Sequence, residues 1–241
     1  MVEIISDIGN IRELNEDAAG NLLKEEFNLF VVCDGMGGHN AGEVASSLAL
    51  ETIRAYLEEN FSRDDAGDRL IKAVELANEK IYLLSRSDQV LKGMGTTVTT
   101  ALACYGYVHV AHVGDSSMFR IRDGAIRKVT KDHSLVQELV DMGSITKEEA
   151  RVHPNKNIIT RAVGTNEKVT VDTFHIRSRI DDVYIICTDG LTDYIAEDEI
   201  LNMYEVNRDI RSLSRHLVST AKERGGKDNI TLLIFEGEAI K

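Results

Sequence analysis

Four apolar segments of this chain each meet an aspartate at one end. Three of them end at Asp34, Asp115 and Asp189, and the fourth begins at Asp228. Short apolar runs rich in Val and Ile are typical of buried strands. Carboxylates at the ends of such strands can converge without lying inside the sheet. An oxygen-rich cluster suits hard ions such as Mg²⁺ or Mn²⁺, whereas Zn²⁺ prefers nitrogen and sulfur. The sequence therefore predicts a metal site at strand ends.

The bulk composition is that of an ordered globular protein without a nucleic-acid partner. Of 241 residues, 43% are hydrophobic and 28% are charged, which argues against disorder. The formal net charge is −12, and the chain has no basic stripe that could replace counterions along a nucleic-acid backbone. Phosphorylated substrates remain compatible with this charge, because metal ions on an acidic cluster would attract a phosphate.

We expect a cytoplasmic protein with no membrane segment. No apolar run approaches the roughly 18–20 residues that a membrane-spanning helix needs. Residues 1–7 have neither the basic start nor the apolar core of a signal peptide. The three cysteines, Cys33, Cys104 and Cys187, are odd in number, and two of them lie inside apolar runs. We therefore expect buried, reduced thiols rather than disulfides.

Periodicity predicts three long helices and a larger number of strands. Apolar residues recur at helical spacing over 41–61, 65–85 and 209–224. Besides the four segments above, extended structure is predicted for 95–105, 117–122, 125–130 and 170–176. Most of these strands follow one another instead of alternating with helices, so antiparallel sheets with helices packed outside them fit better than a parallel doubly wound sheet.

We expect a single domain over residues 1–241. Proline occurs once, at Pro154, and no linker-like stretch or internal repeat divides the chain. Residues 135–165 are mixed, polar and poor in strand signal, so they could form a helical flap beside a site.

Two of the three Asp-Gly pairs in the chain have different interpretations. Asp123-Gly124 lies between two predicted strands and is a good two-residue hairpin turn. Asp34-Gly35 instead opens a stretch with four glycines in eight residues, which is costly in chain entropy unless the backbone must approach something closely. No Lys or Arg occurs from 25 to 53, so a phosphate-binding P-loop does not fit. A cation bound by the Gly35 carbonyl fits these residues better.

A polar stretch near the N-terminus has two interpretations. Arg12 is followed closely by Asn15, Glu16 and Asp17. These residues could form a solvated loop. Alternatively, the planar guanidinium of Arg12 could bind a phosphate, with Glu16 and Asp17 holding metal-bound waters.

Seven short motifs together carry a resemblance to a known family. In chain order they are Arg12…Asn15-Glu16-Asp17, Asp34-Gly35-Met36-Gly37-Gly38-His39, Gly93-Met94-Gly95-Thr96-Thr97, Gly114-Asp115-Ser116, Asp132-His133-Ser134, Thr188-Asp189-Gly190 and Asp228-Asn229-Ile230. Their order resembles that of the bacterial metal-dependent serine/threonine phosphatases of the type 2C, or PPM, family. Each motif alone is weak, but seven in register over residues 6–235 are specific.

The resemblance implies an α+β fold of four layers, αββα, in which helices flank two antiparallel sheets. It also implies a binuclear Mn²⁺ or Mg²⁺ centre at one end of this sandwich. In that centre Asp34 would bridge the two ions and Gly35 would contribute its carbonyl. Asp189 and Asp228 would complete the coordination of the first ion.

Other residues would take supporting roles by the same resemblance. Glu16 and Asp17 would support the metal site, partly through water, and Arg12 would bind the substrate phosphate. A third, weaker ion would use Asp115 together with Asp189. Residues 143–164 would form the flap that shapes substrate access.

The resemblance implies hydrolysis of phosphoserine and phosphothreonine in proteins, opposing a bacterial-type serine/threonine kinase. Two divalent ions would activate a water for in-line attack on phosphorus, so no protein nucleophile is required. The segments around Cys33 and Cys187 lack the basic residues that activate a catalytic thiol. Two alternatives stay open, a catalytically inactive member that binds phosphoproteins and a hydrolase of small phosphoesters. Nothing in the sequence demands an oligomer, so we expect a monomer.

The chain departs from the family pattern at two points. Ser117 stands where many relatives have Arg, two residues after the aspartate of the Gly-Asp pair, which could alter the third ion's site or local packing. His39 is shifted by an extra Met-Gly from the position of a histidine proposed as general acid in some relatives. His39 could act as that acid or make only a loop hydrogen bond.

Overall fold

Two antiparallel sheets form the centre of the computed structural model, which describes residues 1–37 and 41–237, apart from the side chain of Asn207. Sheet I has the order β1 (Val2–Asp7), β11 (Ile230–Glu236), β10 (Val183–Cys187), β7 (Ser117–Arg122) and β8 (Ala125–Lys128). Sheet II has the order β2 (Asp17–Leu23), β3 (Asn28–Met36), β5 (Val98–Cys104), β6 (Tyr107–Val113) and β9 (Asp172–Arg177), and β4 (Gly95–Thr96) pairs with the end of β3.

The central strands are buried on both faces, which explains their mostly apolar sequences. In β3, Phe30 and Val32 point between the sheets, whereas Val31 points to the opposite face and packs under the helices. This alternation follows from the two-residue period of a strand. Phe30 stacks on Phe235 of β11 with ring centroids 3.9 Å apart, so aromatic contacts join the two sheets directly.

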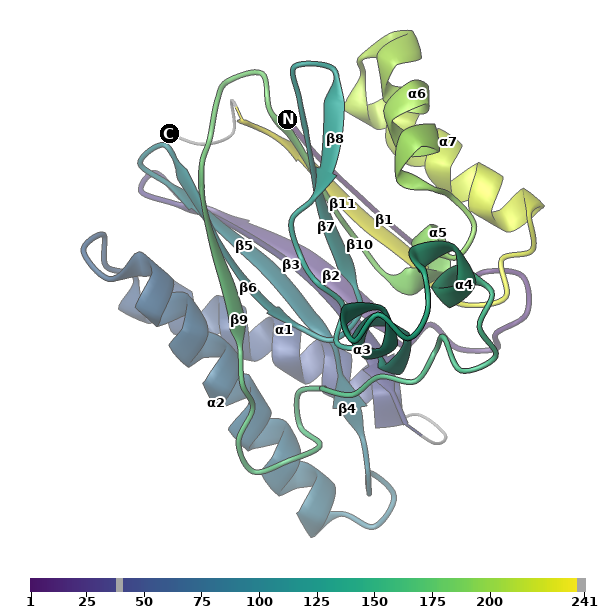
Figure 1. Cartoon of the computed structure of the whole chain (residues 1–241). Helices are drawn as coiled ribbons and strands as arrows, with labels where there is room; N and C mark the ends of the chain where they lie inside the picture. Colours follow the sequence, from purple (N-terminus) through teal and green to yellow (C-terminus); the bar gives the residue numbers. More distant parts are fainter. Residues whose placement is uncertain (38–40, 238–241) are drawn as a thin grey trace.

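Two pairs of helices cover the outer faces of the sheets (Figure 1). α1 (Ala41–Asn60) and α2 (Ala66–Ser87) pack on sheet II, while α6 (Glu197–Asn207) and α7 (Ile210–Glu223) pack on sheet I. On α1 the fully buried residues Ala45, Ala49, Ile53 and Leu57 recur every four positions and form one face of the helix. The four-layer αββα architecture implied by the resemblance is therefore confirmed.

Most predicted elements are present with small boundary changes. The three predicted long helices correspond to α1, α2 and α7 within about two residues at each end. The predicted strand over 95–105 is divided into β4 and β5. Asp123 and Gly124 have φ of 50° and 70° and connect β7 to β8, so the predicted hairpin turn is confirmed. The helix α6 and the strands β1 and β2 were not predicted.

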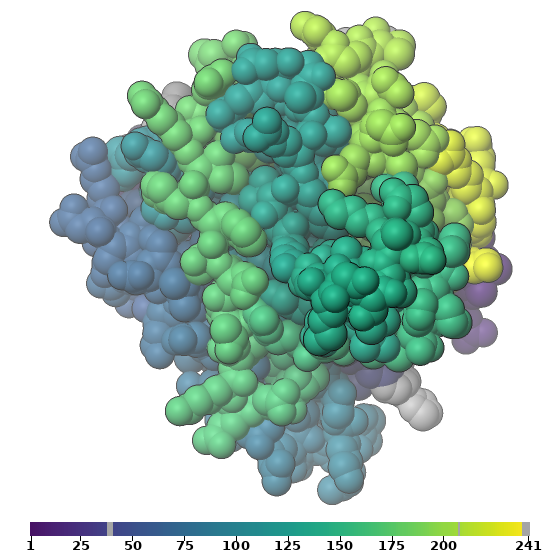
Figure 2. All heavy atoms as spheres, viewed as in Figure 1, coloured from purple at the N-terminus to yellow at the C-terminus, as the bar shows by residue number. Residues whose placement is uncertain are grey.

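The segment between β8 and β9 is a loop closed at its base and carries two short helices. These are α3 (Leu135–Asp141), capped by the Ser134 hydroxyl, and α4 (Lys147–Arg151), which begins with a capping box. The Leu135 N–H donates to the Ile158 carbonyl at 2.9 Å, which ties the two ends of the loop together. α3 and α4 lie on the face of the molecule turned to the viewer in Figure 2.

Candidate active site

The four aspartates of the sequence pattern occupy the ends of strands from both sheets. Asp34 lies near the end of β3 and pairs in register with Asp17 on β2. Asp115 lies in the turn between β6 and β7. Asp189 begins the one-turn helix α5 (Asp189–Thr192) directly after β10, and Asp228 lies two residues before β11.

Electrostatics indicates that these carboxylates share one neighbourhood. Burial raises the pKa of Asp34 well above its ordinary value, and nearby negative charge raises it further. In decreasing order of effect, that charge belongs to Asp17, Asp189, Asp115 and Asp228. The pKa of Asp189 is raised in the same way, first by burial and then by the carboxylates around it. These strand ends therefore bring the carboxylates into one neighbourhood, while their role as metal ligands stays a prediction.

Hydrogen bonds fix the backbone around Asp34 and join the sheets beside it. The Asp34 N–H donates to Thr97 Oγ1 at 2.9 Å, and the Thr96 hydroxyl donates to the Asp34 carbonyl at 2.9 Å. From sheet I, the Thr188 hydroxyl donates to Asp17 Oδ2 at 3.0 Å. Burial, the largest influence on Asp17, raises its pKa to about 7 despite this hydrogen bond. The Asp34–Asp17 pair is thus held between the ends of both sheets.

Residue 35 must be a glycine because other backbone segments of the protein lie against it. A Cβ atom on Gly35 would lie 2.2 Å from the Gly42 carbonyl oxygen and 2.4 Å from the Glu16 carbonyl oxygen. The Gly35 N–H also donates to the Glu16 carbonyl at 3.1 Å. The close approach of the backbone therefore explains why residue 35 is a glycine. That the Gly35 carbonyl binds a metal ion stays a prediction.

Asn229 anchors the loop that carries Arg12 and Glu16, a role that sequence reasoning missed. Its side chain accepts from the Glu16 N–H at 2.8 Å and donates to the Ile8 and Leu14 carbonyls at 3.0 and 2.9 Å. Asn229 is only 4% exposed, so water cannot easily replace these bonds. The motif Asp228-Asn229-Ile230 singled out this residue but did not reveal its partners, which lie more than 200 positions away in the chain.

Arg12 lies at the edge of the carboxylate cluster. Its Nη2 donates to Asp228 Oδ2 at 2.7 Å, and its Nη1 lies 3.8 Å from Glu16 Oε2. Partial burial would lower the pKa of Arg12, but the hydrogen bond to Asp228 and the surrounding negative charge raise it. The Arg12 side chain is 46% exposed, so its guanidinium remains accessible to a phosphate from solvent.

The donor atoms fit a hard metal ion. Glu16 Oε1 and Asp115 Oδ1 are buried and have no hydrogen-bond partner. Buried polar atoms are normally satisfied, so orphaned carboxylate oxygens among other carboxylates favour a bound cation. All these donors are oxygens, which Mg²⁺ and Mn²⁺ prefer. Within residues 1–37 and 41–237, no three Asp, Glu, His or Cys side chains are arranged closely enough to bind one metal ion together. The carboxylates are therefore neighbours, but their oxygens do not surround a common point.

The remaining predictions near the site have mixed outcomes. All three cysteines are buried and free, as expected. Burial, the largest cause, raises the pKa of Cys187 to about 12, so this thiol is not activated. Ser117 is buried in β7 opposite Cys187, where it fills a strand position. His39 lies outside the described residues.

Comparison with known proteins identifies the family. The profile of protein phosphatase 2C matches residues 12–233. The chain belongs to the protein phosphatase 2C family. Among curated members, the serine/threonine phosphatase stp of Listeria monocytogenes serotype 4b is 38% identical over 238 residues, which are 97% of this chain and 94% of that protein.

Solved structures of the phosphatase 2C family share this fold closely. The serine/threonine phosphatase Stp1 from Staphylococcus aureus is 35% identical, with a TM-score of 0.91 over 98% of this chain and 94% of that one. The catalytic domain of the serine/threonine protein phosphatase PstP, in complex with two manganese ions, is 34% identical, with a TM-score of 0.86 over 97% of this chain and 96% of that one. In the part of the chain that the structure describes, no helix is both long and apolar enough to cross a membrane.

Proposed function

We propose that this chain is a metal-dependent protein phosphatase that hydrolyses phosphoserine and phosphothreonine in proteins. The proposal rests on a cluster of carboxylates where the strand ends of the two sheets meet, in a chain of the phosphatase 2C family. When bound, divalent ions lower the pKa of a water and neutralise the charge of the phosphoryl group. A protein nucleophile is not needed, and the buried thiols are unsuited to be one.

The residues around the cluster take the following roles in this proposal. Asp34, the Gly35 carbonyl, Asp189 and Asp228 would hold the divalent ions. Glu16 and Asp17 support the site from β2 and the preceding loop, partly through water. Arg12 orients the phosphate, since its exposed guanidinium already lies against Asp228. His39 stays a candidate general acid, outside the described residues.

The metals would be Mn²⁺ or Mg²⁺, two per chain, and Asp115 and Asp189 would hold a weaker third ion. The support comes from the all-oxygen donor set and from the orphaned oxygen of Asp115. A relative, the PstP catalytic domain, is described as a complex with two manganese ions.

We further propose that residues 1–241 form one domain, in which residues 143–164 serve as the flap. The shared core between the sheets and the closed base of the α3–α4 loop support this division. Phosphorylated proteins are the partners, among them a cognate serine/threonine kinase, and the chain acts in the cytoplasm as a monomer. The net charge of −12 disfavours nucleic acid as a partner.

Hydrolysis of a phosphothreonine peptide tests the function. The purified protein is assayed after chelation and again with Mn²⁺ or Mg²⁺ restored, beside Asp34→Asn as a matched inactive variant. Turnover that requires metal and disappears in Asp34→Asn is the expected result. Absence of turnover with any metal in a folded protein would refute the proposal. Faster turnover of small phosphoesters than of the peptide would reassign the substrate.

A further inference from the structure

A cavity of about 440 Å³ lies beside the candidate metal ligands. Asp115 and Asp189 form part of its wall, so the cavity is continuous with the proposed site of hydrolysis. The α3–α4 loop contributes a second part of the wall and the segment from α5 into α6 a third, and Figure 1 shows these elements next to each other. Its size falls within the range of about 300–1,000 Å³ that is usual for ligand sites.

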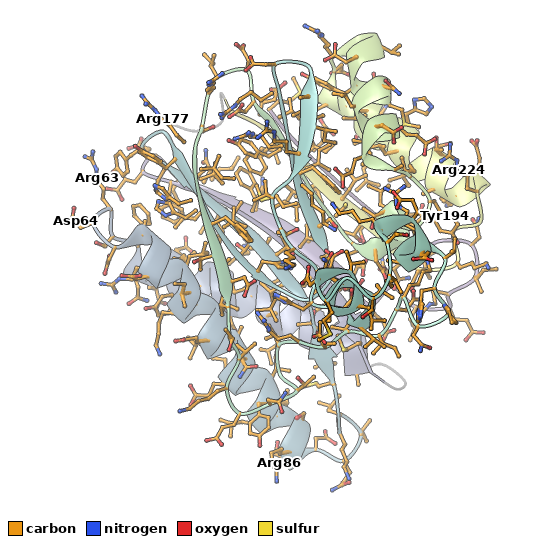
Figure 3. The ribbon with its side chains drawn as sticks, in the orientation of Figure 1. Arg63, Asp64, Arg86, Arg177, Tyr194 and Arg224 are labelled. Atoms are coloured by element: carbon orange, nitrogen blue, oxygen red, sulfur yellow. The ribbon has the colours of Figure 1, made fainter. Side chains whose placement is uncertain are left out.

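Half of the ten charged residues that line this cavity are held in ion pairs. Three ion pairs neutralise acids of the wall, namely Lys128–Asp132 at 2.7 Å, Lys156–Asp193 at 2.6 Å and Arg224–Glu199 at 2.6 Å. Arg224 also donates to the carbonyl of Tyr194, and Figure 3 shows these two residues side by side. Glu199 is thus held by Arg224 and is not free to neutralise another cation of the cavity.

Two cations of the flap are left over. Lys147 and Arg151 both line the cavity, and neither has an acidic partner within 4.0 Å among the described residues. They are four residues apart on α4, which places both side chains on one face of the helix. Among the described residues, three acids of the wall also have no cation partner: Glu197 of α6 and the two candidate metal ligands Asp115 and Asp189. Bound metal ions would neutralise Asp115 and Asp189, so Glu197 is the acid left beside the two cations.

The cavity also has an apolar part. Phe119, Val136, Val140 and Ile195 contribute to the wall. Apolar walls lower the local dielectric constant, which strengthens the attraction between the flap cations and an anion that enters.

We propose that Lys147 and Arg151 form a subsite for an anionic side chain of the protein substrate, a carboxylate or a second phosphate. The inference rests on the proposed function, because the substrate must be a phosphorylated polypeptide. A roughly spherical cavity of this volume is about 9 Å across, so the anion lies about two or three extended residues from the phosphorylated one. The enzyme therefore prefers acidic or multiply phosphorylated segments.

Matched peptides test this preference. Each peptide contains one phosphothreonine. In one placement the test residue (Glu, Gln, Lys or phosphoserine) occupies the second and third positions before the phosphothreonine, and in the other placement it occupies the second and third positions after it. For one of these two placements, we expect wild-type kcat/KM to be roughly tenfold higher for the Glu peptide than for the Gln peptide, the size expected of two partly exposed charge pairs. The phosphoserine peptide shows whether a second phosphate serves as well as a carboxylate.

Variants then assign the preference to the flap. In Lys147→Ala/Arg151→Ala the ratio of the Glu to the Gln peptide falls to about one, and in Lys147→Glu/Arg151→Glu the Lys peptide becomes the better substrate. The ratio is the readout because loss of folding or metal would lower both rates together. Arg177→Ala is the matched control, since this exposed arginine lies far from α4 in Figure 3.

The outcomes distinguish failure of the proposed phosphatase function from failure of the proposed anion subsite. If wild-type protein hydrolyses none of the peptides, the proposed function fails and the subsite fails with it. If it hydrolyses the Glu and Gln peptides equally in both placements, or if the preference persists in Lys147→Ala/Arg151→Ala, the subsite alone is refuted.

Discussion

Replacing Asn229 with alanine should damage both the stability and the activity of the enzyme. The substitution removes the three hydrogen bonds that hold the loop of Arg12 and Glu16. At about 0.5–1.5 kcal/mol each, their loss costs about 1.5–4.5 kcal/mol of unfolding free energy. Because Asn229 is buried, its partners are left unsatisfied, and we expect about 3 kcal/mol. For a domain of this size the Tm then falls by about 6–12 °C.

The same substitution should weaken catalysis through Arg12. The loop that carries this residue loses its attachment to the start of β11, so the guanidinium is no longer held beside Asp228. A charged hydrogen bond is worth about 1.5–3 kcal/mol, so kcat/KM for a phosphothreonine peptide should fall roughly 10- to 100-fold. The assay uses metal-saturated protein at a temperature where the variant is fully folded.

Two further variants make this test specific. Asn229→Asp keeps the acceptor for the Glu16 N–H but loses both donors and adds a buried charge beside the carboxylate cluster, so its Tm should fall at least as far as that of Asn229→Ala. Asn60→Ala removes a single hydrogen bond to the Tyr56 carbonyl, far from the site in sequence, and should cost about 1 kcal/mol with unchanged kcat/KM. A Tm for Asn229→Ala within about 2 °C of wild type, or an unchanged kcat/KM, would refute the reasoning.

Three other changes have defined outcomes. Arg12→Ala should lower kcat/KM roughly 10- to 100-fold while leaving the Tm nearly unchanged, as measured by peptide hydrolysis and thermal denaturation. Asp189→Asn should lower kcat by at least about 100-fold without altering the circular dichroism spectrum, and should raise the Tm in the presence of chelator because one of several repelling charges is gone. The side chain of Asp182 has no exposed surface. Burial, the largest influence, would raise its pKa, but the hydrogen bonds that it accepts, of which the one from Arg122 has the greatest effect, lower the pKa below the ordinary value of 3.8. Its contribution to stability is therefore complete above that value and lost as the pH falls through the lowered pKa. Asp182→Asn should cost about 3 kcal/mol near neutral pH and flatten the dependence of the urea midpoint on pH below 5.

The sequence predicted the central strands because burial on both faces leaves a local signature. β3, β10 and β11 are mostly apolar runs, and their side chains fill cores on both sides. The long helices were also predicted, since α1, α2 and α7 each place one apolar face against a sheet.

The missed elements are defined by distant partners instead. β2 contains Asp17, two alanines and Gly20, a composition with little strand propensity, and its strand form comes from pairing with β3. A Cβ atom on Gly20 would lie 3.2 Å from Leu50 of α1, so this glycine lets the helix pack closely on the strand. α6 begins at Glu197 without a side-chain cap on Ala196, and its first turn is tied by Glu199 to Arg224. Neither contact can be seen in a local window of sequence.

The candidate site shows the same division between local and distant information. The aspartates could be singled out from the sequence because each interrupts or borders an apolar strand. This pattern can be recognised within a window of a few residues. The stacking of the two sheets, fixed by contacts such as Phe30 on Phe235, brings Asp34 of sheet II close to Asp189, which follows β10 of sheet I. The roles of Asn229 and of the Thr188 hydroxyl depend on that stacking, so they became visible only in three dimensions.

The position of the cluster has an energetic consequence for the whole fold. Two sheets that meet through apolar side chains gain stability along their length, yet at one end they bring several carboxylates together. Without a cation these charges repel one another across the interface between the sheets, whereas a bound divalent ion would turn the repulsion into attraction. Asp34 lies on one sheet and Asp189 directly follows a strand of the other, so an ion held by both residues would couple metal binding to sheet packing. A site assembled from one sheet alone would lack this coupling, and its metal affinity would not depend on how the two halves of the sandwich pack.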